Sequence, residues 1–66
     1  MKNYIVIHYL NGKKILIRDF GEDFESAKKY ARFVSYYSYQ TGNHKIVVIE
    51  KNSPISDKLY SESFIL

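Results

Sequence analysis

The dipeptide Asn11-Gly12 constrains the fold of this 66-residue chain more than any other feature, because it separates two apolar segments of strand-like composition. Asn-Gly favours a two-residue type I′ turn, since both residues tolerate the positive φ angles that this turn requires. Residues 3–10 and 13–20 are rich in Ile, Val, Leu and Tyr, which are typical of strands. The sequence therefore predicts a β-hairpin.

A regular two-residue turn also fixes which residues face each other across the hairpin. We expect it to pair Leu10 with Lys13, His8 with Ile15, Ile7 with Leu16 and Val6 with Ile17. One face would then carry Tyr4, Val6, His8, Leu10, Ile15 and Ile17, and the other Ile5, Ile7, Tyr9, Leu16 and Phe20, with Lys14 and Arg18. Both faces of the hairpin are thus expected to be apolar.

A helix is predicted from residue 24 to about residue 39, after Gly21 ends the hairpin. Asp23 can cap it, because a carboxylate accepts hydrogen bonds from the free N–H groups of the first turn. At helical spacing one stripe carries Phe24, Ala27, Tyr30, Ala31, Val34, Ser38 and Thr41, with Tyr37 at its border. We expect this stripe to face the sheet, and Gly42-Asn43 to stop the helix.

Residues 44–51 predict a third strand, apolar on both faces, built on Ile46-Val47-Val48-Ile49. Asn52-Ser53-Pro54 should end it, because proline has no N–H and restricts the residue before it. Residues 59–66 are too apolar for a solvated tail and are expected to dock as a short fourth strand. The chain is thus predicted to be one α+β domain, residues 1–66, of order β-β-α-β with a C-terminal fourth strand, and with the helix on one sheet face.

Composition narrows the class of protein further. The chain has no cysteine and two histidines, so disulfides and a structural metal are not expected. Its longest apolar runs are four residues, against about 20 for a membrane-spanning helix, and we expect a cytoplasmic protein without membrane contact. A core this small needs reinforcement, so a homodimer is predicted.

The sequence shows no nucleophile motif, phosphate-binding loop or metal-ligand spacing, so we predict a protein that is not an enzyme and has no cofactor. His8 is interpreted as a half-buried or interface residue, because two histidines alone make a poor metal site. An acidic cluster is interpreted as helix capping rather than as a general acid and base pair, and comprises Asp19, Glu22, Asp23 and Glu25.

The outer face of the predicted helix is both basic and aromatic. Tyrosine and arginine are enriched at the centres of protein interfaces, although tyrosine can also lie over neighbouring apolar surface with its hydroxyl in water. The residues that we predict to bind a partner are Lys28, Lys29, Arg32, Phe33, Tyr36 and Tyr39.

These features favour a small protein-binding module that inhibits or modulates a partner by occlusion. Amino acids with A/T-rich codons, namely Lys, Ile, Asn, Tyr and Phe, make up nearly half of the chain. That bias is typical of phages, archaeal viruses and mobile elements, so an accessory protein acting in a host cytoplasm is one hypothesis. The alternative is a small DNA- or RNA-binding regulator, because a net charge of +3 and tyrosines on a basic helix also suit phosphates and bases.

Overall fold

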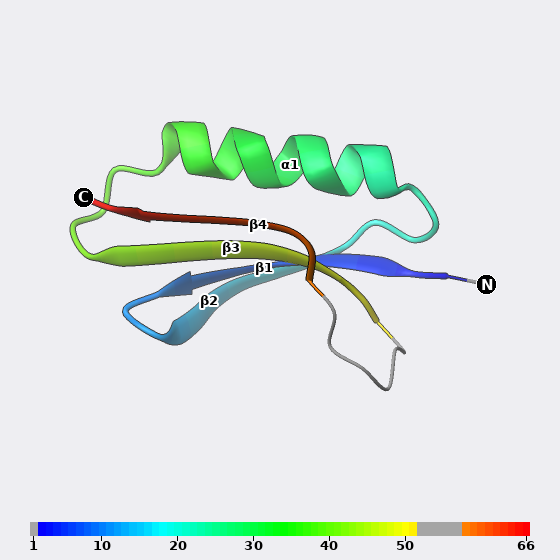
Figure 1. Cartoon of the computed structure of the whole chain (residues 1–66), viewed down its shortest axis with the longest axis horizontal. Helices are drawn as coiled ribbons and strands as arrows, with labels where there is room; N and C mark the ends of the chain where they lie inside the picture. The colour runs from blue at the N-terminus through cyan, green and yellow to red at the C-terminus, as the bar shows by residue number, and fades with distance from the viewer. Residues whose placement is uncertain (1, 52–57) are drawn as a thin grey trace.

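The computed structural model describes residues 2–51 and 58–66 (Figure 1). Its elements are β1 (Tyr4–Leu10), β2 (Lys13–Asp19), α1 (Phe24–Tyr37), β3 (Asn43–Glu50) and β4 (Lys58–Ile65). The four strands form one antiparallel sheet in the order β2-β1-β3-β4. The predicted α+β fold of order β-β-α-β is confirmed, and the C-terminal segment is the fourth strand. The predicted break at 52–54 lies outside the described residues.

The β1–β2 turn has the predicted type I′ character, because Asn11 and Gly12 both adopt positive φ, at 53° and 81°. The side chain of Asn11 also reaches the neighbouring strand. Its Oδ1 accepts a 2.9 Å hydrogen bond from the backbone N–H of Asn43, and its own backbone N–H donates to the Asn43 carbonyl at 2.8 Å. The turn is therefore tied to the start of β3.

The predicted register of the hairpin is wrong beyond the first two pairs. Leu10 lies opposite Lys13 as expected, but a β-bulge leaves Ile15 without a partner on β1. The observed pairs after the bulge are His8 with Leu16, Ile7 with Ile17 and Val6 with Arg18. Because an extra residue in one strand reverses the side on which all later residues lie, Leu16, Arg18 and Phe20 face the helix and Ile17 faces away from it.

Helix α1 begins as predicted and ends two residues earlier. Asp23 Oδ1 accepts from the backbone N–H of Ser26 at 3.0 Å, which is the expected N-cap. At the other end Ser38 is extended, with ψ of 132°, and its hydroxyl donates to the Val34 carbonyl at 2.6 Å. That side-chain bond satisfies a terminal carbonyl, so the helix stops before Tyr39 and not at Gly42. Thr41 is exposed and not part of the stripe.

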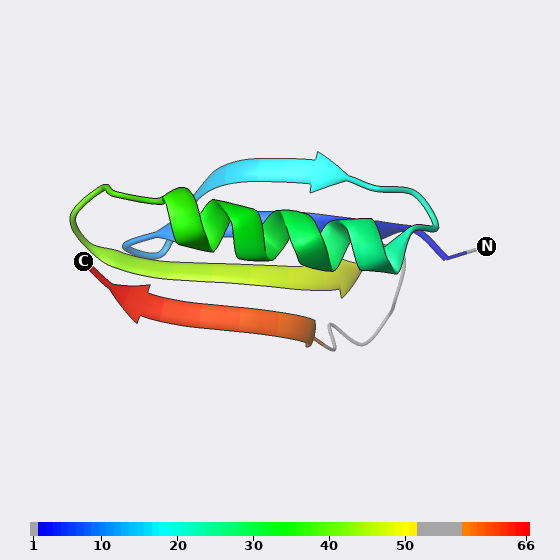
Figure 2. The same cartoon turned by 90° about the horizontal axis from the view of Figure 1, so that it is seen from above.

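One layer of apolar side chains between α1 and the sheet forms the core. α1 packs mainly on β1 and β3 (Figure 2). Ala27 and Ala31 are fully buried and small, so the helix can approach Val6, Ile46 and Val48 closely. Larger, partly buried side chains surround them, as predicted for Phe24, Tyr30 and Val34. β3 is shifted by one residue from the predicted 44–51. The helix covers one face, and none of the elements formed by residues 2–51 and 58–66 covers the other, which is called the open face below.

Candidate binding surfaces

Two surfaces and one buried pair of histidines carry side chains that the core does not explain. The first surface is the outer side of α1, where the sequence placed the partner-binding residues. The second is the face of the sheet opposite α1. The histidines lie between the helix and the sheet, near the end of α1.

Five of the six predicted residues lie on the outer side of α1, and the sixth, Tyr39, lies beyond its end. Lys28 lies beside the N-terminal turn, where its Nζ is 3.7 Å from the Glu25 carboxylate and 5.6 Å from the centre of the Phe24 ring. Lys29 and Arg32 are exposed. Helical periodicity places Lys28 and Arg32 on one flank and Phe33 on the other, with Lys29 between them.

The two predicted tyrosines are the most exposed aromatic side chains described. Tyr36 is 82% exposed on the helix, and Tyr39 is 90% exposed. Tyr39 lies beyond the end of α1, so it is not aligned with Lys28, Arg32 and Tyr36 along one side of the helix. Its role in binding stays a prediction.

The structure groups a different set of aromatic residues, in a row along the β2 flank of α1. Successive ring centres lie 4.6 to 6.4 Å apart along the row Phe20, Tyr30, Phe33, Tyr37 and Tyr36. The guanidinium of Arg18 lies 4.8 Å from the Tyr30 ring centre and 5.2 Å from that of Phe20. The helical spacing of Tyr30, Phe33 and Tyr37 could have indicated this row. Arg18 joins it only because the bulge in β2 turns its side chain toward the helix.

The open face of the sheet is apolar at its centre. Cross-strand pairing places Ile17, Ile7 and Val47 in one row, and Ile5 and Ile49 side by side in the next. Ile7 and Val47 are only 5% and 4% exposed, although no described helix covers them. Ile17 at the β2 edge is 55% exposed. These five residues are called the apolar block below.

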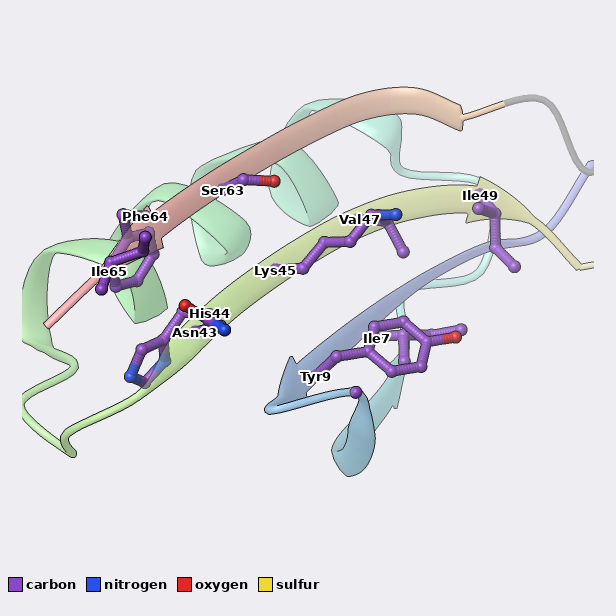
Figure 3. A pocket seen from close by; sticks show the side chains of 11 residues that line it. Ile7, Tyr9, Asn43, His44, Lys45, Val47, Ile49, Ser63, Phe64 and Ile65 are labelled. Atoms are coloured by element: carbon purple, nitrogen blue, oxygen red, sulfur yellow. The ribbon is translucent and has the colours of Figure 1, made fainter.

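A groove of about 960 Å³ runs over this face (Figure 3). Its lining comes from β1, β3, β4 and the hairpin turn, and includes Ile7, Val47 and Ile49 of the apolar block. Tyr9 and Lys45 lie opposite each other on β1 and β3, and Lys14 is the partner of Tyr9 on β2. The open face therefore carries a row Lys14-Tyr9-Lys45 beside the apolar block. Sequence reasoning noted strands that are apolar on both faces, but the wrong register hid which β2 residues share this face.

The two histidines form a hydrogen-bonded pair under the end of α1. His8 Nε2 lies 2.9 Å from His44 Nδ1, and His44 Nε2 lies 2.6 Å from the carbonyl oxygen of Gln40. Because a carbonyl only accepts, His44 Nε2 carries the hydrogen, and the neutral ring then accepts at Nδ1 from His8. Both rings are buried, and that of His44 stacks on Phe64 at 4.7 Å. His8 is thus more deeply buried than predicted.

Burial lowers the pKa of His8, and the neighbouring His44 lowers it further. The charged form of His8 is therefore disfavoured in the folded protein. Among the described residues no three His, Cys, Asp or Glu side chains are grouped so that they could hold a metal ion. The pair has the geometry of a structural link between β1, β3 and the segment after α1.

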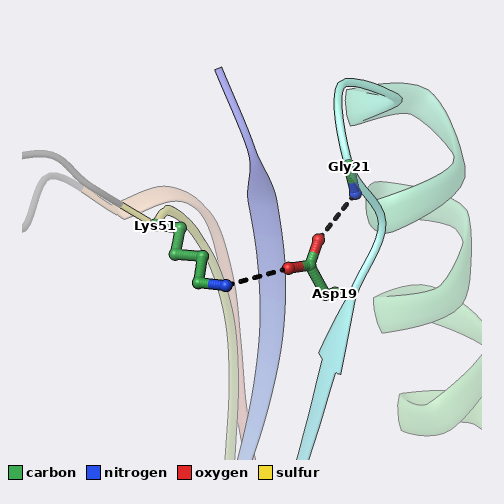
Figure 4. Close-up of polar contacts among 3 residues, drawn as sticks. All are labelled: Asp19, Gly21 and Lys51. Atoms are coloured by element: carbon green, nitrogen blue, oxygen red, sulfur yellow. Dashed lines mark hydrogen bonds and ion pairs between the residues drawn. The ribbon is translucent and has the colours of Figure 1, made fainter. Parts of the chain in front are cut away.

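The acidic residues between β2 and α1 stabilise local structure. Asp19 Oδ1 accepts from the backbone N–H of Gly21 at 2.7 Å, and its Oδ2 lies 3.3 Å from Lys51 Nζ (Figure 4). The hydrogen bond from Gly21, aided by Lys51, lowers the pKa of Asp19. The Ser26 hydroxyl and then its N–H lower that of Asp23 in the same way. Asp23 therefore caps α1 as predicted, whereas Asp19 holds the turn after β2 and pairs with Lys51 instead of capping the helix.

Comparison of the chain with family models, with curated proteins and with solved structures gives no match. In the part of the chain that the structure describes, no helix is long and apolar enough to cross a membrane.

Proposed function

We propose that this chain is a non-enzymatic protein-binding module that uses the open face of its sheet to occlude a surface of its partner. The observation that carries the proposal is the groove on the sheet face that no described helix covers, lined by Ile7, Val47 and Ile49, with the 55% exposed Ile17 on the same face. Concave surfaces with an apolar lining and exposed apolar side chains mainly mark interaction sites in soluble proteins. In a domain this small, covering that surface would also add stability that the single core lacks.

The open face favours a protein over a small molecule. The groove is an open depression on a four-stranded sheet, and Ile17, on the same face of the edge strand β2, is more than half exposed. An open, mostly apolar surface bordered by Lys14, Tyr9 and Lys45 resembles the core and polar rim of a protein interface. A second copy of this chain would be one such protein, and sedimentation across a wide concentration range tests for it.

A capture experiment with two matched variants tests the proposal. The tagged chain is crosslinked in cells of its source, and the yield of each captured protein is compared for wild type, Ile17→Ser and Tyr36→Ser. Both substitutions replace an exposed large side chain by the same small one, on opposite sides of the molecule. We expect Ile17→Ser to reduce capture of the specific partner at least about fivefold, as for an interface anchor, and Tyr36→Ser to leave it unchanged.

The reverse result would assign binding to the helix surface, where Tyr36 was predicted to act. Circular dichroism and urea unfolding of both variants are the control that tests whether the fold is intact. If neither variant alters the captured proteins, the open face is not the binding surface.

Nucleic-acid binding is the second candidate function, and one observation favours it. Residues 26–49 contain no Asp or Glu, so the charged side chains of this segment are all basic, and it carries Tyr30, Phe33, Tyr36, Tyr37 and Tyr39. Exposed tyrosines with nearby cations suit single-stranded nucleic acid. Fluorescence anisotropy with a labelled single-stranded oligonucleotide tests this, because such binding should weaken at least about tenfold between 50 and 200 mM salt.

A further inference from the structure

The open face of the sheet has a fixed charge pattern as well as an apolar centre. Lys14 and Lys45 flank Tyr9 in one cross-strand row at the hairpin end of the groove. Among the described residues no carboxylate side chain lines the groove. Asp19, opposite Ile5, is the one described carboxylate at an open-face register position, and it is already paired with Lys51 and the Gly21 N–H. The face is therefore apolar in the middle and cationic at its hairpin end, and at the other end Lys58 takes the register position opposite Ile49.

We infer that the groove receives an amphipathic α-helix of a partner protein, and that this helix bears carboxylate side chains next to its apolar stripe. The inference rests on the proposed function and adds the chemistry of the partner. The apolar stripe would lie on Ile7, Val47 and Ile49. The carboxylates would lie over Lys14 and Lys45, where opposite charges are favoured and like charges are excluded.

The charge pattern favours a partner helix over a second copy of the chain. A second copy would present the same face, whose described carboxylate at an open-face position, Asp19, is already paired with Lys51 and is not free to pair with Lys14 and Lys45. A helix about 10 Å wide can lie along the strands within the four-stranded face.

The other side of the same strands shows that this sheet accommodates a helix. β1 and β3 already bind α1 through the small residues Ala27 and Ala31 and the side chains Val6, Ile46 and Val48. A helix on the open face would complete a three-layer arrangement in which β1 and β3 are buried on both sides. Strands that are apolar on both faces are typical of such sheets.

Selection from a peptide library tests the inference without knowledge of the natural partner. A displayed library of amphipathic helices, with apolar positions varied among Leu, Ile, Phe and Ala and flanking positions among Glu, Lys and Gln, is selected on immobilised wild-type protein. We expect the enriched peptides to carry Glu at flanking positions. When an enriched peptide binds, the amide chemical shifts of the protein should change mainly in β1, β3 and the β2 residues of the open face.

Charge reversal supplies the matched control. Lys14→Glu with Lys45→Glu reverses the cationic row, and Lys29→Glu with Arg32→Glu makes the same change in net charge on the helix surface. The open-face pair should weaken binding of the enriched peptides at least about tenfold, and the helix pair less than about threefold. Peptides with Glu exchanged for Lys should recover binding to the open-face variant. If that variant does not fold, Lys14→Gln with Lys45→Gln should still weaken binding about threefold or more.

Several results would overturn the inference: no enrichment, enrichment of neutral or basic peptides, equal losses in the two charge-reversed variants, or a wild-type protein whose open face is occupied by its own second copy. These differ from failure of the proposed function. If Ile17→Ser abolishes capture of the cellular partner but the Lys14 and Lys45 reversal does not, the open face binds protein and only the partner chemistry is wrong. If neither has an effect, both proposals fail.

Discussion

The buried histidine pair predicts that the protein loses stability below neutral pH. Because the pKa of His8 is lowered in the folded state, the unfolded chain binds a proton more readily than the folded protein does. The contribution of neutral His8 is therefore fully present above the ordinary histidine pKa of 6.5 and is lost progressively as the pH falls below that value. The loss ends once the pH passes the folded-state pKa.

The size of this loss in unfolding free energy is set by how strongly His8 is protonated in the unfolded chain. At pH 5.0 a histidine with its ordinary pKa gains about 2 kcal/mol from protonation, so a folded state that keeps His8 neutral loses up to that amount. A domain of this size has only about 3–5 kcal/mol in total, so the loss would be a large part of its stability. The lowered pKa values of Asp19 and Asp23 act in a separate window, because their stabilisation is lost only as the pH falls below 3.8 toward their folded-state values.

Urea unfolding followed by circular dichroism between pH 7.5 and 5.0 measures this effect. His8→Gln is the control, because its amide N–H can donate to His44 as the imidazole does but does not titrate. We expect the wild-type unfolding free energy to fall by about 1–2 kcal/mol across this range, and that of the variant to fall by less. An unfolding free energy that is constant with pH in the wild type, or an equal fall in both proteins, would refute the reasoning.

Three further substitutions test the fold, each by thermal or urea unfolding. Gly12→Val should cost about 1 kcal/mol or more, because a β-branched residue resists the positive φ of the type I′ turn; unchanged stability would contradict that turn. Gly42→Ala should cost about 1–3 kcal/mol, since φ is 139° and the new Cβ would lie 2.8 Å from the Asn11 side chain; a neutral result would mean that Asn11 does not clasp β3. Ile46→Val should cost about 1 kcal/mol and lower Tm by about 4–8 °C, and a smaller shift would place Ile46 outside the tight core.

The sequence predicted the elements that depend on local signals. Asn11-Gly12 defines its turn through backbone conformation alone, and the Asp23 cap and the alanine stripe lie within a few residues of each other. The end of α1 differs from the prediction because Ser38 adopts an extended conformation, with its hydroxyl bonded to the Val34 carbonyl, and the apolar pattern gives no signal for this. Tyr39 was consequently assigned to a helix face on which it does not lie.

The sheet register and the candidate site depend on contacts between distant residues. Ile15-Leu16-Ile17 is apolar throughout, so strand alternation cannot show which phase is adopted, and the bulge was not predicted. The His8–His44 hydrogen bond joins residues that only the β1–β3 pairing brings together. The groove was indicated by strands apolar on both faces. Of its basic row, the hairpin register already paired Lys14 with Tyr9, but only the β1–β3 pairing places Lys45 beside them.

Strand β2 can pair with β1 in two registers that differ by one residue. The three consecutive apolar residues Ile15, Leu16 and Ile17 fit either register. Arg18 and Phe20 distinguish the two, because their contacts with Tyr30 form only in the observed register. In the other register Arg18 would lie on the open face next to Ile5, and Ile17 would face the helix. A shift of one residue would thus replace Ile17 by Arg18 on the open face without any change of sequence. A chain without Ile15 would have only one such register and would keep the observed open-face residues.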